Sequence, residues 1–298
     1  MRQTDGSAGD ANYGEIGRNY SAYRQPEPAI EAMIRAELDG AQTVLNVGAG
    51  AGSYEPRDRT VTALEPSASM RAQRPPDLPE AIDGVAEHLP FADKSFDAVM
   101  ATFTVHQWPD LEAGLAEMRR VARGPVVILT CNPAEVQDFW LNDYAPAVLA
   151  AEARRYPSFD RLRDGLCTAV KIVPVPIPLN CRDGFNEAYY GRPEMFLDDK
   201  ARLSCSAWSF VPPDVASASV AALKHALDTG TWDARHAVLR QQPTYTGSLY
   251  LVVSHALTKN ALSRLAGEGA FAVSSPGTDQ NLRPTPSITP LVSVLSNE

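Results

Sequence analysis

The chain has 298 residues, of which 44% are hydrophobic, and its formal net charge at pH 7 is −9. This length and composition allow a sizeable buried core in one decorated α/β domain. The acidic balance and the lack of any Lys/Arg run disfavour a nucleic-acid substrate, because such a surface repels phosphate backbones. The first ten residues lack the apolar core of a signal peptide, and no apolar run could cross a bilayer. We therefore expect a cytoplasmic protein without membrane insertion.

The cysteines and histidines indicate no metal site and no disulfide framework. The sequence contains no C-x-x-C pair, and its histidines show no ligand spacing. This pattern is typical of separate, reduced thiols. The four cysteines are Cys131, Cys167, Cys181 and Cys205.

The N-terminal part is predicted to be helical. Residues 13–39 carry apolar side chains at helical spacing, interrupted by Pro26 and Pro28, and Gly40 is a stop signal. We expect residues 1–40 to form an N-terminal helical lid. The same segment offers a surface for a homo-oligomer.

Short apolar runs then alternate with helical patterns. Continuous apolar strands joined by helices predict a mostly parallel sheet with helices on both faces. A helix is predicted over residues 111–121. The predicted strands are residues 43–47, 61–64, 82–86, 96–101 and 126–131.

The second half of the chain is less regular. Residues 136–156 show a helical pattern, residues 170–179 read as an edge or distorted strand because of their prolines, and residues 247–255 predict a last strand. Between them, residues 180–245 are rich in aromatic side chains, which either line a substrate pocket or form plain core. Residues 261–298 contain few large apolar side chains and are predicted to be a flexible tail.

A glycine-rich loop follows the first predicted strand. Gly48, Gly50 and Gly52 have the spacing G-x-G-x-G, which lets the backbone turn tightly and approach a ligand. Glu65 ends the second predicted strand, where a carboxylate can accept hydrogen bonds from both ribose hydroxyls. Together they favour a nucleoside site over an ordinary tight turn.

Four segments in order resemble the motifs of class I S-adenosylmethionine (SAM)-dependent methyltransferases. The branch they are most similar to contains ubiquinone- and menaquinone-biosynthesis enzymes and many bacterial natural-product enzymes. The resemblance implies a Rossmann-like fold over residues 41–260, with residues 180–245 as a substrate cap. The segments are Asn46-Val47-Gly48-Ala49-Gly50-Ala51-Gly52, Leu64-Glu65-Pro66-Ser67, Ala86-Glu87-His88-Leu89-Pro90-Phe91 and Ser95-Phe96-Asp97-Ala98-Val99.

The resemblance also implies which residues contact SAM, the methyl donor whose product is S-adenosylhomocysteine (SAH). They fall into groups beside the methionine part, the ribose, the adenine and the sulfonium. These residues are Asn46, Gly48, Ala49 and Gly50 for the methionine part, Glu65 for the ribose, Pro66, Met70, Ala86 and Glu87 for the adenine, and Ala101 and Thr102 for the sulfonium.

The chain departs from the family pattern at three places. The family usually has an acid at the positions of Asn46 and Val85, and the eight residues between Gly52 and Val61 leave room only for a turn in place of the usual first helix. We expect Arg24 or Tyr20 from the leading helix to cover the SAM carboxylate instead.

His106 is the candidate general base. It lies in the loop after the fourth predicted strand, where ligands of open α/β sheets bind, and an imidazole titrates near neutral pH. Two alternatives stay open: a histidine that only fills the loop, and methylation of an alkene carbon, which needs no base at first.

The predicted function is methyl transfer from SAM to a small-molecule acceptor in bacterial secondary or quinone-like metabolism, on carbon, oxygen or nitrogen. One rival is a nucleotide-dependent oxidoreductase, which Ser53 disfavours because a dinucleotide fingerprint has glycine or alanine there. A catalytically inactive SAM-binding protein is another. A nucleic-acid methyltransferase is disfavoured because Thr102-Phe103 replaces the motifs of that class after the fourth strand.

Overall fold

We describe residues 20–255 of a computed structural model. These residues form a seven-stranded sheet of order β3-β2-β1-β4-β5-β9-β6 and a small two-stranded sheet of β7 and β8. In the large sheet β9 runs antiparallel to both of its neighbours, β5 and β6, and the other neighbouring strands are parallel. The strands are β1 (Thr43–Val47), β2 (Thr60–Leu64), β3 (Ala81–Ile82), β4 (Ala98–Thr102), β5 (Val126–Cys131), β6 (Val170–Pro174), β7 (Ile177–Pro178), β8 (Thr244–Tyr245) and β9 (Leu249–Ser254).

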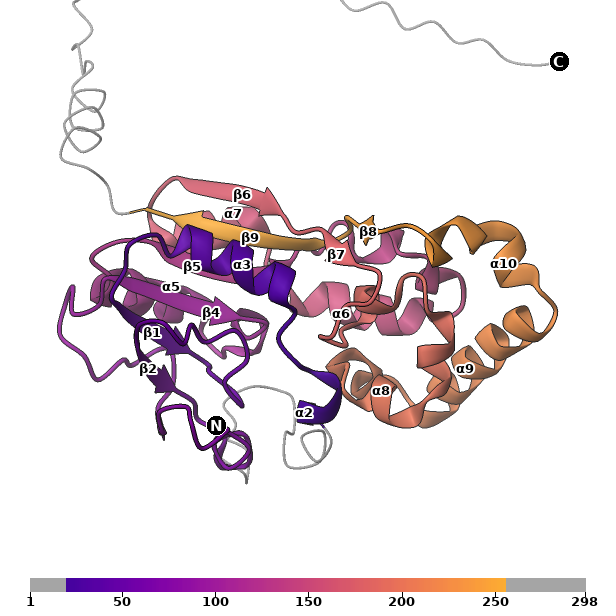
Figure 1. Cartoon of the computed structure of the whole chain (residues 1–298), viewed down its shortest axis with the longest axis horizontal. Helices are drawn as coiled ribbons and strands as arrows, with labels where there is room; N and C mark the ends of the chain where they lie inside the picture. Colours follow the sequence, from indigo (N-terminus) through magenta and orange to yellow (C-terminus); the bar gives the residue numbers. More distant parts are fainter. Residues whose placement is uncertain (1–19, 256–298) are drawn as a thin grey trace, which may run out of the picture. The chain divides into compact units, whose positions relative to one another are not determined.

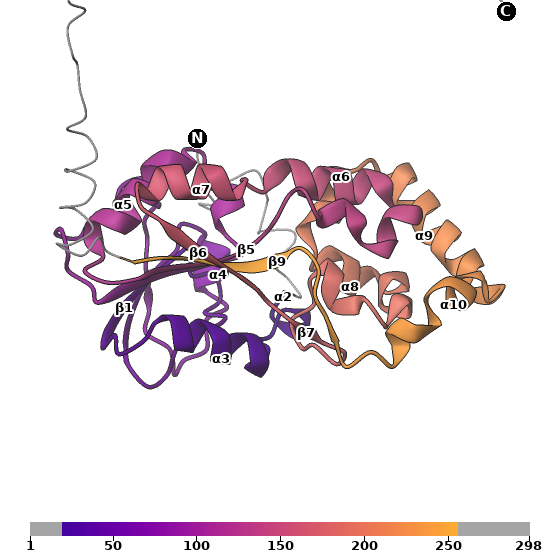
Figure 2. The same cartoon turned by 90° about the horizontal axis from the view of Figure 1, so that it is seen from above.

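Helices cover both faces of the large sheet, as Figure 2 shows, with α5 and α7 on one face and α3 on the other. The α-helices are α2 (Tyr20–Tyr23), α3 (Pro28–Glu37), α4 (Ala68–Arg71), α5 (Leu111–Val121), α6 (Pro146–Arg155), α7 (Phe159–Leu166), α8 (Asp199–Leu203), α9 (Pro213–Asp228) and α10 (Thr231–His236). The 3-10 helices are η2 (Val105–Gln107), η3 (Val136–Asp138), η4 (Trp140–Asp143), η5 (Asn186–Tyr189), η6 (Pro193–Leu197), η7 (Ser206–Phe210) and η8 (Ala237–Arg240). The predicted α/β fold with a mostly parallel sheet is confirmed.

Strand alternation explains how both faces are buried. In β1, Leu45 and Val47 pack with α5 and α7, whereas Val44 packs with α3. Proline lacks an N–H, so it suits the first turn of α3, which Pro28 opens. Ile30 and Ile34 of α3 are fully buried against the sheet. This part of residues 1–40 is therefore sheet core, and a lid formed by the segment before it stays a prediction.

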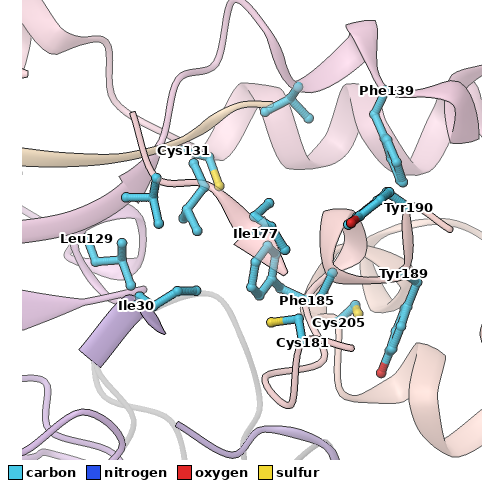
Figure 3. Packing of buried hydrophobic residues seen from close by; sticks show 14 of the residues in the cluster. Ile30, Leu129, Cys131, Phe139, Ile177, Cys181, Phe185, Tyr189, Tyr190 and Cys205 are labelled. Carbon is cyan, nitrogen blue, oxygen red and sulfur yellow. The ribbon is translucent and has the colours of Figure 1, made fainter. Parts of the chain in front are cut away.

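The cap region, residues 180–245, lies beyond one end of the large sheet (Figure 1). Its aromatic side chains are mostly core: Tyr190, Phe196 and Trp232 are fully buried. Figure 3 shows Cys131 and Ile177 in the same packed cluster as cap residues such as Phe185 and Tyr190. One continuous apolar core thus joins the cap to the sheet.

Two predicted elements differ from the observed ones. The third strand is only Ala81–Ile82, because residues 83–86 leave the sheet edge and cross the strand ends, where Gly84 passes close to Leu64. The helix predicted over residues 136–156 is split into η3, η4 and α6. Phe139 is extended, and Pro146 can only begin a helix. The predicted tail, residues 261–298, lies outside the described residues.

Candidate functional site

A cleft opens where the strand order reverses, between β1 and β4. Ligands of open α/β sheets bind at such a point, outside the carboxyl ends of the strands. The space between its walls is about 820 Å³, with the open solvent at its mouth included. Its lining residues come mostly from the segments after β1, β2 and β4. They are Arg24, Gly48, Ala49, Gly50, Ala51, Ser53, Tyr54, Leu64, Glu65, Pro66, Met70, Val85, Ala86, Glu87, Thr102, Phe103, Thr104, Gln107, Trp108 and Asp183.

The glycine loop forms one wall of this cleft. Gly48 has φ +69°, and a Cβ atom there would lie 2.2 Å from Thr104 Oγ1. The amides of Gly48 and Ala49 both donate to the carbonyl of Leu64, at 2.9 and 3.0 Å. Only glycine satisfies both the left-handed backbone and this close approach at position 48.

Glu65 is fixed against the glycine loop. Its Oε2 accepts a hydrogen bond from the Gly50 amide at 2.8 Å, and its Oε1 accepts one from the Ser67 amide at 2.8 Å. Burial raises the pKa of Glu65, and the two amide donors oppose that shift. The loop and the carboxylate therefore form one rigid unit, with the carboxylate on the cleft.

Most of the residues expected to contact SAM line this one cleft. Asn46 and Ala101 do not, because each lies within a strand and is fully buried, Ala101 on the side of α5 and α7. The side chain of Tyr20 lies outside the described part of the chain. The expected residues on the cleft are Arg24, Gly48, Ala49, Gly50, Glu65, Pro66, Met70, Ala86, Glu87 and Thr102.

Asn46 takes part in a different contact. Its Nδ2 donates to Glu55 Oε1 at 3.0 Å, and Glu55 forms a buried ion pair with Arg74 at 2.8 Å. The Glu55 and Arg74 side chains are 0% and 3% exposed. This pair anchors residues 48–59, which contain no helix, as the short spacing predicted.

A smaller side pocket of about 380 Å³ adjoins the cleft. Arg24, Phe103 and Gln107 line both spaces. Phe103 has φ +52°, an uncommon value for a side-chain-bearing residue, and its ring packs on Phe185 at 5.3 Å. The other lining residues are His106, Glu152, Tyr156, Asn186, Ser204, Cys205 and Ser206.

His106 lies on the side pocket and does not line the main cleft. Its ring packs on Tyr156 at 4.5 Å, and its Nδ1 has no hydrogen-bond partner within residues 20–255. Burial, followed by the positive charges of Arg155 and Arg24, holds the pKa of His106 well below its usual value. The imidazole is therefore neutral at physiological pH, the form that can accept a proton.

The acidic group of the side pocket was not predicted from the sequence. Glu152 Oε2 accepts a hydrogen bond from Asn186 Nδ2 at 2.6 Å, and Asn186 in turn accepts one from Trp208 Nε1 at 3.1 Å. Burial raises the pKa of Glu152. No motif marks these residues, since they come from α6, η5 and η7 and meet only through the tertiary fold.

Tyr54 and Asp183 were missed on the main cleft. Tyr54 Oη donates to Asp183 Oδ2 at 2.8 Å, and Arg24 forms an ion pair with the same carboxylate. The three residues are far apart in the sequence, so no local spacing predicts the contact.

Residues 20–255 hold neither a metal-ligand cluster nor a membrane-spanning helix. No cluster of three or more His, Cys, Asp or Glu side chains there is arranged for a metal ion. No helix of this part is long and apolar enough to cross a membrane. Cytoplasmic location and homo-oligomer formation stay predictions.

Parts of the chain are similar to known methyltransferases. A family described as "Methyltransferase domain" matches residues 45–128. The chain is 40% identical over 89 residues to a demethylmenaquinone methyltransferase of Renibacterium salmoninarum, covering 28% of this chain and 37% of that one. It is 30% identical over 140 residues to a malonyl-[acyl-carrier protein] O-methyltransferase of Erwinia pyrifoliae, covering 43% of this chain and 53% of that one. The chain thus spans about half or less of the length of the curated relatives that it matches.

A solved structure shares the fold over a longer stretch. It is described as a methyltransferase from an antibiotic biosynthesis pathway of Anabaena variabilis. Its TM-score is 0.72 at 27% sequence identity, and the match covers 78% of this chain and 98% of that one. The chain therefore carries a methyltransferase domain in residues 45–128, and SAM is the methyl donor that this kind of domain uses.

Proposed function

We propose that this chain transfers a methyl group from SAM, bound in the main cleft, to a small molecule bound in the side pocket. One observation carries the proposal: the glycine loop and the amide-bonded Glu65 face the same cleft at the switch point of the sheet, and a second pocket adjoins it. Two adjoining pockets are what a reaction between a nucleoside cosubstrate and an acceptor requires.

The cleft offers a fitting partner to each part of SAM. The backbone of residues 48–50 would lie along the methionine part, the Glu65 carboxylate would accept the ribose hydroxyls, and Met70 would pack on the adenine. Arg24 has a guanidinium on the same cleft and would bind the SAM carboxylate.

The side pocket favours a compact, polar acceptor. Apart from Phe103 and Phe185, its lining side chains carry polar or thiol groups. Glu152 offers a buried acceptor oxygen to a hydroxyl or amino group. This lining suits methylation on oxygen or nitrogen better than methylation of a prenyl carbon, whose chain would need an apolar channel.

His106 is the residue that would take the acceptor's proton. SAM supplies a methyl group activated by its sulfonium sulfur. As the methyl group passes to the acceptor oxygen or nitrogen, that atom's proton would go to the neutral imidazole. The likeness to a protein of antibiotic biosynthesis supports a role in bacterial natural-product formation.

The test uses SAM with a labelled methyl group and a small-molecule extract of the source cells. We expect label in a compound of low molecular mass, with SAH formed in equal amount. Label only in protein or nucleic acid would contradict a small-molecule acceptor. Glu65→Ala should remove the labelling, whereas Glu112→Ala, a change in an exposed glutamate of α5, should not.

A further inference from the structure

The family's usual acid at the end of β1 is replaced here by Asn46, and the structure gives the reason. Asn46 donates to Glu55, whose carboxylate is buried with Arg74. An aspartate at position 46 would put a second carboxylate against Glu55 in a buried site, which is unfavourable. Position 46 therefore offers no carboxylate to a ligand in the main cleft.

Asp183 reaches the cleft from the cap region. It is 2% exposed and lines the same space as residues 48–50. An isolated β-bridge joins it to Arg24, and the neighbouring Gly184 amide donates to the Tyr23 carbonyl at 2.7 Å. Its carboxylate is thus held at the cleft by backbone contacts of its own segment.

The contacts of Asp183 leave it able to accept one more donor. Tyr54 Oη donates to its Oδ2, and Arg24 donates to its Oδ1. Burial and the negative charge of Asp183 raise the pKa of Tyr54 well above its usual value, so the hydroxyl stays protonated and continues to donate. A carboxylate has about four acceptor positions, so these two bonds do not exhaust it.

The other two acids that line the described part of the cleft, Glu65 and Glu87, have different hydrogen-bond partners. Glu65 is fixed by two amides at the ribose position, and Glu87 accepts from the Asp110 amide at 3.2 Å. Among the described lining residues, this leaves one carboxylate without an assigned role, Asp183, and it pairs with one guanidinium, Arg24. This pair of opposite charges matches the two charges of an amino-acid zwitterion.

We propose that Asp183 binds the α-ammonium group of SAM, in place of the acid that relatives have at position 46. The proposal rests on the proposed function, because it assumes that SAM occupies the main cleft. It makes a residue of the cap, far in sequence from every methyltransferase motif, part of the cosubstrate site.

The experiment compares three ligands by calorimetry: SAH, its analogue with hydrogen in place of the amino group, and 5′-methylthioadenosine, which lacks the amino-acid part. The wild type should prefer SAH to the desamino analogue by about 10- to 100-fold, the usual effect of one hydrogen bond to a charged group. Asp183→Asn should lose that preference and bind 5′-methylthioadenosine within about twofold of the wild type. Tyr54→Phe keeps the carboxylate and should keep the preference.

The outcomes separate the two proposals. An unchanged preference in Asp183→Asn would overturn the assignment, as would equal weakening of all three ligands, which indicates a merely structural role. A wild type that binds none of the three overturns the proposed function itself. If Asp183→Asn does not fold, Asp183→Glu should retain a reduced preference for SAH.

Discussion

Most of the walls of the main cleft come from residues 48–108. Backbone groups make many of the hydrogen bonds that hold these walls in place. The side pocket takes its polar side chains from Arg24, from residues 106–156 and from cap residues 186–206, which meet only in the folded protein. Backbone contacts depend on local geometry and suit a cosubstrate shared by a whole family. Side-chain contacts from distant segments can change without altering the sheet, which suits the choice of acceptor. Variants of the two regions should therefore affect different steps.

Gly48→Ala should have the largest effect, on the cleft. The added Cβ would lie 2.2 Å from Thr104 Oγ1, at a backbone φ of +69° that alanine rarely adopts. We expect affinity for SAH to fall by about 1,000-fold or more, because both the strain and the clash act on the binding wall. Gly40→Ala is the matched control, since no atom lies within 4 Å of its added Cβ and its φ is not positive. Wild-type affinity in Gly48→Ala would refute the placement of the cosubstrate.

Glu55→Ala should have the next largest effect, on stability. It leaves Arg74 buried without its carboxylate, which typically costs about 3–5 kcal/mol. Glu112→Ala breaks an ion pair of similar length with Arg161, but both partners are more than half exposed, and we expect less than about 1 kcal/mol. Denaturant unfolding of the two variants measures the difference. Similar losses would show that the Glu55–Arg74 pair does not anchor the loop.

His106→Ala should change the function of the side pocket and leave that of the main cleft intact. We expect turnover to fall by about 100-fold, the usual contribution of a general base, while affinity for SAH stays unchanged. His225→Ala, an exposed change on α9, is the control. Because the pKa of His106 lies well below its usual value, the base stays neutral and the wild-type kcat should stay flat from pH 8 down to pH 6. An inflection near pH 6.5 that disappears in His106→Ala would contradict the buried environment.

Glu187→Gln, a change in the buried interior of the cap, should give the smallest effect, which is on the pH dependence of stability. Burial raises the pKa of Glu187 to about 7 from an ordinary value of 4.5. The folded state thus binds the proton on Glu187 more tightly than the unfolded state does. The stability that comes from this bound proton is fully present below pH 4.5 and is lost as the pH rises to 7. Between pH 5 and 8, the wild type should lose about 2 kcal/mol more than Glu187→Gln does. Parallel pH profiles of the two proteins would show that Glu187 is not the group responsible.

The sequence predicted the cleft better than the side pocket, for a physical reason. Glycines after a buried strand and an acid after the next strand are set by local backbone geometry, so the positions of residues 48–50 and Glu65 could be predicted. Glu152, Asn186 and Asp183 reach their pockets through tertiary packing, and nothing in their local sequence marks them. The mostly parallel sheet and the helices on both of its faces followed from the alternation of apolar runs.

Two details show where pattern reasoning failed. Asn46 was expected on the cosubstrate, but strand alternation turns its side chain away from the cleft, toward Glu55. The third strand was predicted too long, because its apolar residues Val85 and Ala86 line the cleft and do not pair in the sheet. In both cases contacts in the folded protein decide where the side chain lies, and the sequence pattern of a single strand does not show those contacts.

The most direct test of the central claim is calorimetric titration of the purified chain with SAH and, separately, with NAD. We predict binding of one SAH per chain and no detectable binding of NAD, because Ser53 stands where a dinucleotide fingerprint has glycine or alanine. Binding of NAD without SAH, or no heat with either ligand, would contradict it.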